Sequence, residues 1–158
     1  MQARDIMSPN VITISENASI QEAARKLADY RISGMPVLDN EQRVIGIVSE
    51  IDIINKTGTT VGNIMSRRVI SVQEDASMDA IAQLLTGNHI KRVPVLAGDR
   101  LLGIVSRADI VRMMASRWVC QVCGAVHLGQ MPLVCNDCGV EGVHLARELD
   151  PRTEITVR

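Results

Sequence analysis

The sequence contains one stretch twice, and this internal repeat constrains the fold more than any other feature. Residues 5–16, DIMSPNVITISE, return as residues 63–74, NIMSRRVISVQE, and the same offset of 58 residues relates Pro36 to Pro94. Such repetition indicates two copies of one structural unit. Because a unit of about 55 residues buries too little surface to be stable alone, we expect the copies to pack together. Clefts between them would then accept small molecules.

Each copy has the pattern of a strand, a helix, two strands and a second helix. The first copy predicts strands at 11–14, 35–38 and 44–48, with helices that begin at Ser19 and Ser49. The second copy predicts strands at 69–72, 93–96 and 101–105, with helices that begin at Ser77 and Ser106. Ser19 followed by Glu22 is the sequence pattern of a capping box.

The predicted fold class is α+β: two β-α-β-β-α repeats with pseudo-two-fold symmetry, followed by a small β-hairpin ribbon stapled by a metal. We expect repeat 1 over residues 1–58, repeat 2 over 59–116 and the metal-bound segment over 117–158. The formal net charge is −1, and no apolar run reaches the roughly 18 residues that span a bilayer. We therefore expect a cytoplasmic protein with neither a membrane nor a nucleic acid as its partner.

Three sequence motifs, each present in both copies, resemble those of a known family. Asp5-Ile-Met-Ser, Gly34-Met-Pro-Val-Leu and Gly46-Ile-Val-Ser-x-x-Asp52, with their second copies, resemble a pair of cystathionine β-synthase (CBS) domains over about residues 1–116. The resemblance implies adenosine-containing ligands such as AMP, ADP, ATP or S-adenosylmethionine. It also implies a role as an energy or metabolite sensor and pairing into homodimers.

A Ser-x-x-Asp motif begins the last helix of each copy, as Ser49 with Asp52 and as Ser106 with Asp109. By itself the motif is a helix N-cap with a carboxylate in the first turn, which stabilises a helix by about 1 kcal/mol. The CBS resemblance implies a second role, in which the Asp accepts hydrogen bonds from ribose hydroxyls and the Ser faces the ligand.

The second copy carries the cations that a phosphate group requires. Lys91 and Arg92 precede its Pro-Val-Leu phrase, and Arg107 lies inside its Ser-x-x-Asp motif, where the first copy has Glu50. Fixed cations offer charge-assisted hydrogen bonds to phosphate oxygens, although most Lys and Arg side chains are simply solvated. We expect the cleft of the second copy, with Asp109, to be the stronger phosphate site.

Three apolar positions are candidates for the adenine contact. The CBS resemblance implies this role for Ile12 and Ile70, on the first strand of each copy, and for Val93 on a later strand. Packing in the core is the alternative for all three.

All four cysteines fall in one short segment, as Cys120-x2-Cys123-x11-Cys135-x2-Cys138, and a glycine follows each pair. Two such knuckles place four sulfurs around one metal ion, a geometry suited to zinc or to a single iron. Disulfides are disfavoured in a cytoplasmic chain. His127 lies between the knuckles, and because four thiolates already close the coordination shell, we expect it on the surface.

The segment from Trp118 to Gly139 resembles the short rubredoxin-like domain that ends rubrerythrins, through both knuckles, Gly129 and Pro132. Such domains carry iron and transfer electrons, whereas related zinc ribbons carry zinc with a structural role. Asn136 stands where a Pro is usual, and the aromatic cluster of full-length rubredoxins is missing. Zinc and iron therefore both stay open.

Three functions fit these features. The leading one is a regulatory protein whose CBS pair senses an adenine nucleotide. The others are an electron-transfer protein gated by nucleotide and an interaction module with structural zinc.

We expect no enzyme, because no Ser-His-Asp or Cys-His grouping and no Gly-rich phosphate loop is evident. From Trp118 onward five acidic residues face three basic ones, which disfavours nucleic acid. The final Glu154–Arg158 suggests one strand without an assigned role.

Overall fold

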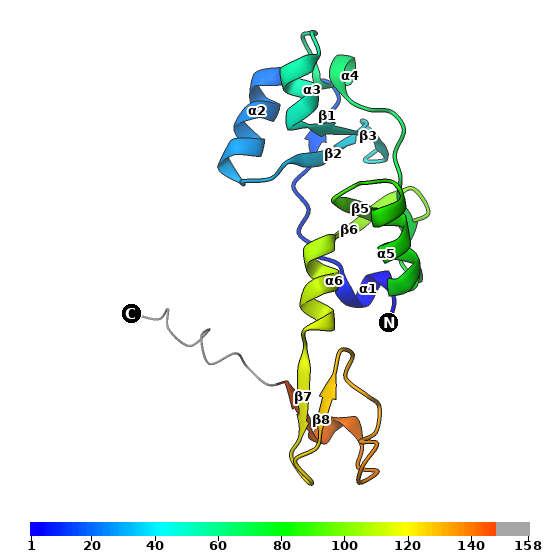
Figure 1. Cartoon of the computed structure of the whole chain (residues 1–158). Helices are drawn as coiled ribbons and strands as arrows, with labels where there is room; N and C mark the ends of the chain where they lie inside the picture. Colours follow the sequence, from blue (N-terminus) through cyan, green and yellow to red (C-terminus); the bar gives the residue numbers. More distant parts are fainter. Residues whose placement is uncertain (148–158) are drawn as a thin grey trace. The chain divides into compact units, whose positions relative to one another are not determined.

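The computed structural model describes residues 1–147 (Figure 1). Contacts within the chain divide it into two compact units, Met1–Arg107 and a second unit that begins at Ala108. This division falls earlier than the domain boundary that we expect after residue 116, and the predicted domain boundaries stay predictions. The first unit holds both sequence repeats except the greater part of the last helix.

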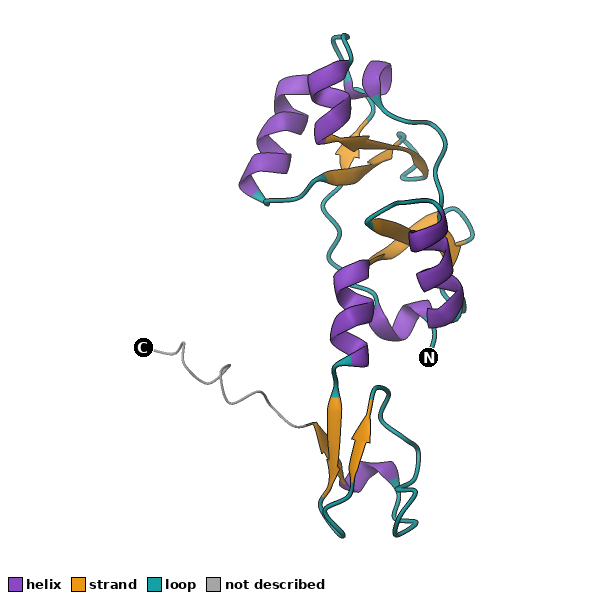
Figure 2. Cartoon of the chain, viewed as in Figure 1, coloured by secondary structure: helices purple, strands orange, loops and turns teal. Residues whose placement is uncertain are grey.

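Both repeats have the predicted order of elements, as Figure 2 shows by colour. Repeat 1 consists of β1 (Ile14–Ser15), α2 (Ile20–Asp29), β2 (Gly34–Leu38), β3 (Val44–Ser49) and α3 (Glu50–Asn55). Repeat 2 consists of β4 (Val72–Gln73), α5 (Met78–Gly87), β5 (Arg92–Ala97), β6 (Arg100–Ser106) and α6 (Arg107–Met114). The strand orders are β1-β2-β3 and β4-β5-β6, in each of which a parallel pair is followed by an antiparallel one. The mixed α+β fold class is confirmed.

The first strand of each repeat is shorter and later than its β-branched run predicts. β1 pairs with β2 only through Ile14 with Val37 and Ser15 with Leu38. β4 pairs in the same way with β5, beginning at Val72. β-branched residues favour extended backbone, but pairing with a neighbour decides where a strand begins. The predicted strands at 11–14 and 69–72 are therefore wrong in their bounds.

A serine begins each of the long helices. The Ser19 hydroxyl accepts a hydrogen bond from the Glu22 amide at 3.1 Å, and Ser77 accepts one from the Ala80 amide at 3.2 Å. The Glu22 carboxylate lies 3.8 Å from Lys26, along the helix and not back at the N-cap. The first helix thus has the predicted serine cap with an ion pair in place of the reciprocal bond of a capping box.

Two short helices, which we call the exchanged helices, each pack against the repeat to which they do not belong in sequence. α4 (Val61–Ile64) lies at the start of repeat 2 in sequence, yet Val61 and Ile64 are fully buried in the core of repeat 1. α1 (Ala3–Ile6) lies at the start of repeat 1, yet the amide of Ala3 donates to the carbonyl of Ala76 in repeat 2 at 2.8 Å. Each copy of the Ile-Met-Ser phrase therefore completes the other repeat, which the sequence repeat does not predict.

The exchanged segments explain a glycine in each repeat. A Cβ on Gly46 would lie 2.5 Å from Sδ of Met65, and a Cβ on Gly103 would lie 2.6 Å from Sδ of Met7. The backbone carbonyl oxygens of Ser66 and Ser8 would lie 3.0 and 2.9 Å from the same two Cβ positions, so a side chain there would force both the methionine and the backbone to shift. The two pairs occupy matching positions in the two repeats.

The second unit contains a three-stranded antiparallel sheet in the order β8-β7-β9. β7 (Arg117–Cys120) and β8 (Val126–Leu128) form the predicted hairpin. β9 (Leu145–Arg147), which follows the 3-10 turn Gly142–His144, adds a strand on the other side of β7 that we do not predict from the sequence. The strand predicted near Glu154–Arg158 lies outside the described residues.

Within residues 1–147, none of the helices has the length and apolar character needed to cross a membrane.

Candidate ligand cavity and candidate metal centre

The first unit contains a cavity of about 440 Å³, a volume typical of small-molecule sites. Both repeats contribute to its wall. Residues from repeat 1 include Ser33, Gly34, Met35, Ser49, Glu50 and Asp52. Residues from the second half of the unit include Ser66, Arg68, Ile70, His89, Lys91, Arg92 and Ile104. The wall therefore combines apolar side chains with several fixed charges.

Asp52 lies in the first turn of α3 and is 8% exposed. Its Oδ2 accepts hydrogen bonds from the Ser49 amide at 2.9 Å and the Ser49 hydroxyl at 2.8 Å, while Lys56 Nζ lies 2.7 Å from Oδ1. Burial acts to raise the pKa of Asp52, but hydrogen bonds from Lys56 and Ser49 outweigh it and bring the pKa below the ordinary 3.8. Asp52 is thus an ionised carboxylate in the cavity wall.

The end of α5 positions the cations of the second repeat. His89 follows the helix with a left-handed φ of 53°, and the amide of Ile90 donates back to the carbonyl of Leu85 at 3.1 Å. This helix ending turns the chain directly into β5. Lys91 and Arg92 therefore lie at the start of the strand, on the cavity wall. Across the cavity, Arg92 Nη2 donates to Ser33 Oγ at 3.3 Å.

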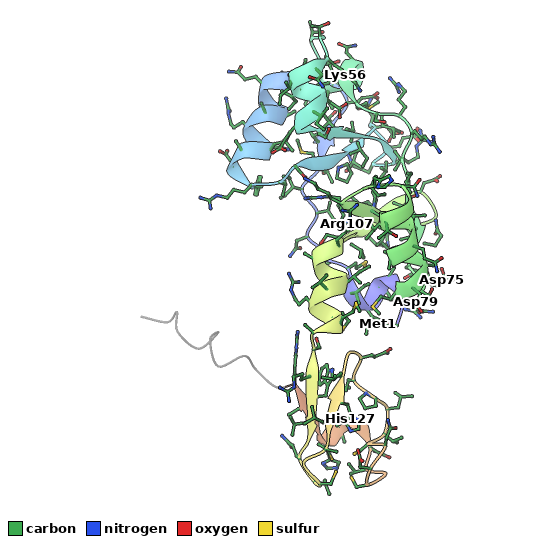
Figure 3. All side chains as sticks on the ribbon, viewed as in Figure 1. Met1, Lys56, Asp75, Asp79, Arg107 and His127 are labelled. Carbon is green, nitrogen blue, oxygen red and sulfur yellow. The ribbon has the colours of Figure 1, made fainter. Side chains whose placement is uncertain are left out.

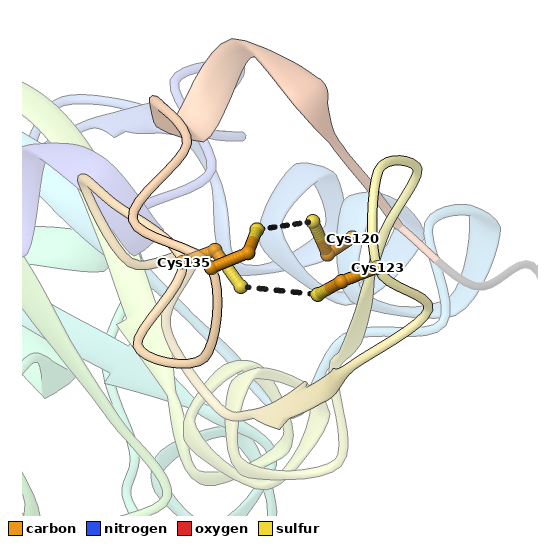
Figure 4. A group of neighbouring side chains, drawn as sticks. Cys120, Cys123 and Cys135 are labelled. Carbon is orange, nitrogen blue, oxygen red and sulfur yellow. Dashed lines mark hydrogen bonds between the residues drawn. The ribbon is translucent and has the colours of Figure 1, made fainter.

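The four cysteine sulfurs of the second unit lie within 4.8 Å of one another. Cys120 Sγ is 3.7 Å from Cys138 Sγ, and Cys123 Sγ is 3.7 Å from Cys135 Sγ (Figure 4). In each knuckle the glycine amide donates to the carbonyl of the first cysteine at 2.8 Å. The glycines that close these turns, Gly124 and Gly139, have φ of 76° and 73°, a backbone region that glycine adopts without strain.

These distances fit a single tetrahedral ion. Metal–sulfur bonds of about 2.3 Å at tetrahedral angles give sulfur–sulfur edges of roughly 3.8 Å, close to the two distances of 3.7 Å. A disulfide, with sulfurs about 2.05 Å apart, does not fit them. Zinc and iron both accept four thiolates. Cys120, Cys123, Cys135 and Cys138 could therefore hold either metal.

The thiols differ in acidity. Hydrogen bonds from the amides of Cys138 and Asp137, together with the contact between Cys135 and the His127 ring, lower the pKa of Cys135 to about 6. An amide hydrogen bond from Ala125 acts to lower the pKa of Cys123, but the neighbouring sulfurs and burial raise it to about 12. Four thiolates crowded together repel one another, and a divalent cation would offset part of that repulsion.

His127 is not the surface residue that we expect from the sequence. Its side chain, labelled in Figure 3, is only 10% exposed, and Nε2 lies 3.4 Å from Cys135 Sγ. The expectation was wrong because it considered only direct metal ligands. Trp118 pairs with His127 across β7 and β8, and this register turns the imidazole toward the cysteine cluster.

Comparison with known families decides the identity of the first part of the chain. A family model for the CBS domain matches residues 3–57 and again residues 61–116. The chain belongs to the CBS-domain family. The four cysteines lie outside both CBS matches. In the structure, the clustering of their sulfurs is what suggests a metal-binding module in this part of the chain.

Solved structures share the fold of this CBS pair. The CBS pair of protein MJ0100, in complex with 5′-methylthioadenosine and S-adenosylmethionine, is 34% identical with a TM-score of 0.65, over 71% of this chain and 94% of that one. CBSX2 of Arabidopsis thaliana, in complex with AMP, is 26% identical with a TM-score of 0.66, over 70% and 93%. Hypoxic response protein I, with two coordinated zinc ions, is 28% identical with a TM-score of 0.64, over 71% and 98%.

Some curated relatives of the CBS pair are much longer proteins. The chain is 29% identical to protein MJ1225 of Methanocaldococcus jannaschii over 73% of its own length, but it spans only 43% of that relative.

The CBS pair brings together half of the ligand residues expected from the sequence. Ser49, Asp52, Ile70, Lys91 and Arg92 all line the cavity described above. Lys91 and Arg92 thus lie with Asp52 of repeat 1, whereas from the sequence we group them with Asp109. The reason is that the cavity wall is built from both repeats, so charges of one copy face the motif of the other. Their roles toward a ligand stay predictions.

The other five expected residues are not in the lining of this cavity. Val93 is fully buried, and Ile12 packs against the core of repeat 1. Arg107 Nη2 donates to the carbonyl of Leu85 at 3.2 Å. Ser106 ends β6, and Asp109 in the second unit lies 3.1 Å from Arg112.

Two further lining residues, Arg68 and His89, are missed by reasoning from the sequence. Comparing the copies position by position offers a signal for Arg68, because the first copy has the uncharged Asn10 there.

Proposed function

We propose that this chain is a non-enzymatic regulatory protein that binds an adenosine-containing ligand, with AMP as the simplest candidate, in the cavity lined by Asp52. The observation that carries the proposal is the presence of Asp52, Lys91 and Arg92 in one wall. Asp52 would accept hydrogen bonds from ribose hydroxyls, and the two cations would bind phosphate. Ile70 and Met35 would contact the adenine.

The charges of the cavity favour a phosphorylated ligand over S-adenosylmethionine. Arg68, Lys91 and Arg92 line the cavity together with Glu50 and Asp52. If Asp52 binds ribose, three cations and one carboxylate remain for the rest of the ligand. A phosphate dianion gains from this balance, whereas a sulfonium cation does not. The adenosine ligands bound by the CBS pairs of MJ0100 and CBSX2 support the general class.

A thermal-shift screen of the full chain tests this proposal. AMP, ADP, ATP, S-adenosylmethionine and 5′-methylthioadenosine are the compounds to compare, with inorganic phosphate as the control. A ligand at 100 times its Kd stabilises the folded state by about 2.7 kcal/mol. A raised Tm with AMP supports the proposal, and no shift with any adenosine compound contradicts it.

We also propose that Cys120, Cys123, Cys135 and Cys138 bind one zinc or iron ion in a rubredoxin-like module. Reduced thiols of this kind are typical of the cytoplasm. The proposed centre would serve electron transfer if it holds iron and structure alone if it holds zinc. A visible spectrum of protein purified without added metal separates the two: thiolate-to-iron bands that bleach on reduction support iron, and a colourless protein with one zinc excludes electron transfer.

Homodimer formation is part of the proposal. Ile51 and Ile54 lie on α3 with exposed fractions of 67% and 78%, and apolar side chains so exposed on one helix favour a protein interface. Light scattering coupled to gel filtration tests it. A dimer that becomes a monomer in the double variant Ile51→Glu, Ile54→Glu is the expected result, and a monomeric parent protein contradicts it.

A further inference from the structure

His127 contacts a sulfur of the cysteine cluster without being one of its four thiols. Nε2 lies 3.4 Å from Cys135 Sγ and 4.0 Å from Asp137 Oδ2. β8, which carries His127, pairs with β7, which carries Cys120. One sheet therefore positions both a thiol and the imidazole at the cluster.

The negative charge expected of a metal-bound cluster would favour a hydrogen-bond donor at this contact. Four thiolates around a divalent ion carry a net charge of about −2, and the neighbouring Asp137 and Glu141 are also acidic. Hydrogen-bond donors directed at the sulfurs spread that charge. Backbone amides donate to a sulfur in each knuckle, from Ala125 to Cys123 and from Asp137 and Cys138 to Cys135, whereas His127 offers a side-chain group. A metal-bound thiolate would only accept hydrogen bonds, so the contact would place the proton of the imidazole on Nε2.

We propose that His127 is an outer-shell residue of the metal centre, whose Nε2–H donates to the Cys135 thiolate and holds that sulfur in its ligating position. The inference rests on the proposed metal centre and adds a positioning residue that the spacing of the cysteines does not indicate. Outer-shell partners of metal ligands change metal affinity by about 10–100-fold when they are removed.

Cobalt(II) titration of the full-length chain against a competing chelator, at constant neutral pH, tests the proposal. His127→Leu keeps an apolar side chain in place but removes the donor. We expect metal affinity to fall by about 10–100-fold and the thiolate-to-cobalt charge-transfer band to shift. His127→Gln retains an N–H donor and should recover part of both changes. His144→Leu is the matched control, because His144 is an exposed histidine of the same unit.

The outcomes separate the inference from the metal centre itself. If the parent protein shows a four-thiolate cobalt spectrum and His127→Leu matches it in affinity and band position, the outer-shell role is wrong. If the parent spectrum is that of three thiolates and one imidazole and loses the imidazole in His127→Leu, His127 is a ligand and the proposal is overturned. If the parent protein does not bind cobalt through thiolates, the metal centre fails, and the inference with it.

Discussion

Lys56 Nζ lies 2.7 Å from Asp52 Oδ1, so the carboxylate in the wall of the ligand cavity already has a cationic partner. Lys56 (labelled in Figure 3) also donates to the carbonyl of Ile64 at 2.9 Å, which joins α3 to the exchanged helix α4. The matching position in repeat 2 is Met113. The two Ser-x-x-Asp motifs are therefore alike in sequence but not in their surroundings.

The lowered pKa of Asp52 predicts a pH-dependent contribution to stability. A carboxyl whose pKa is lowered in the folded state stabilises that state above its unfolded pKa, near 3.8, and loses this contribution as the pH falls through the folded value. Asp52→Asn should lower the free energy of unfolding by about 1 kcal/mol near neutral pH. Urea denaturation measures the difference in the free energy of unfolding between the two proteins. This difference should be constant above about pH 5, roughly one unit above the unfolded pKa, and should shrink below pH 3.8. A difference that grows toward acid would contradict this account.

Gly46→Ala should destabilise the protein because the new methyl group would meet Met65. The added Cβ would lie 2.5 Å from Sδ of Met65 and 3.0 Å from the carbonyl oxygen of Ser66. Overpacking of this kind costs about 1–3 kcal/mol. Gly87→Ala is the control, since Gly87 is the last residue of α5 and a Cβ there meets nothing within 4 Å, so alanine should not destabilise the protein. Chemical denaturation measures both, and equal stabilities would count against the packing of Met65 on Gly46.

Glu50→Gln should strengthen AMP binding. Glu50 lines the same cavity as Lys91 and Arg92, and its negative charge would oppose a phosphate bound by those cations. Removing one like charge at this range is worth about 1 kcal/mol, or roughly fivefold in affinity. Adenosine, which lacks the phosphate, should bind the parent and the variant equally. A variant that gains affinity for both compounds, or for neither, would show that phosphate does not lie near Glu50.

Metal removal should unfold the cysteine-bearing part of the second unit, residues 117–147, and leave the CBS pair intact. The buried core at the cysteine cluster consists of Cys120, Cys135 and Leu145, too little to fold without the ion. Trp118, the one tryptophan, reports on this unit because its Nε1 donates to the carbonyl of Gly129 at 2.8 Å. After chelation its emission should shift to the red while the helical circular dichroism persists. Complete metal loss with unchanged emission would be the contrary result.

Much of the CBS pair could be predicted from the sequence, because its signals are local. Helices with Ser19 and Ser77 at their N-caps and strands around Pro36 and Pro94 depend on periodicity within a few residues. The packing of α1 on repeat 2 and of α4 on repeat 1 could not be predicted, since the two repeats are similar in sequence and either one could receive each helix. For the same reason, the sequence does not predict that Lys91 lines one cavity with Asp52, because packing between the repeats determines it.

The four-cysteine cluster was predictable because the spacing of its ligands carries the chemistry. The contact of His127 with Cys135 was not, since it depends on the register of β7 and β8. A histidine near four thiols has no sequence pattern of its own.

Isothermal titration calorimetry with AMP tests the central claim, that one cavity joins Asp52 of repeat 1 to the cations of repeat 2. Asp52→Asn should weaken both AMP and adenosine by about 10–100-fold, because each loses charge-assisted hydrogen bonds to the ribose. Lys91→Ala with Arg92→Ala should weaken AMP to a similar extent and leave adenosine unchanged. Full AMP affinity in Asp52→Asn, with binding lost in Asp109→Asn, would contradict the claim.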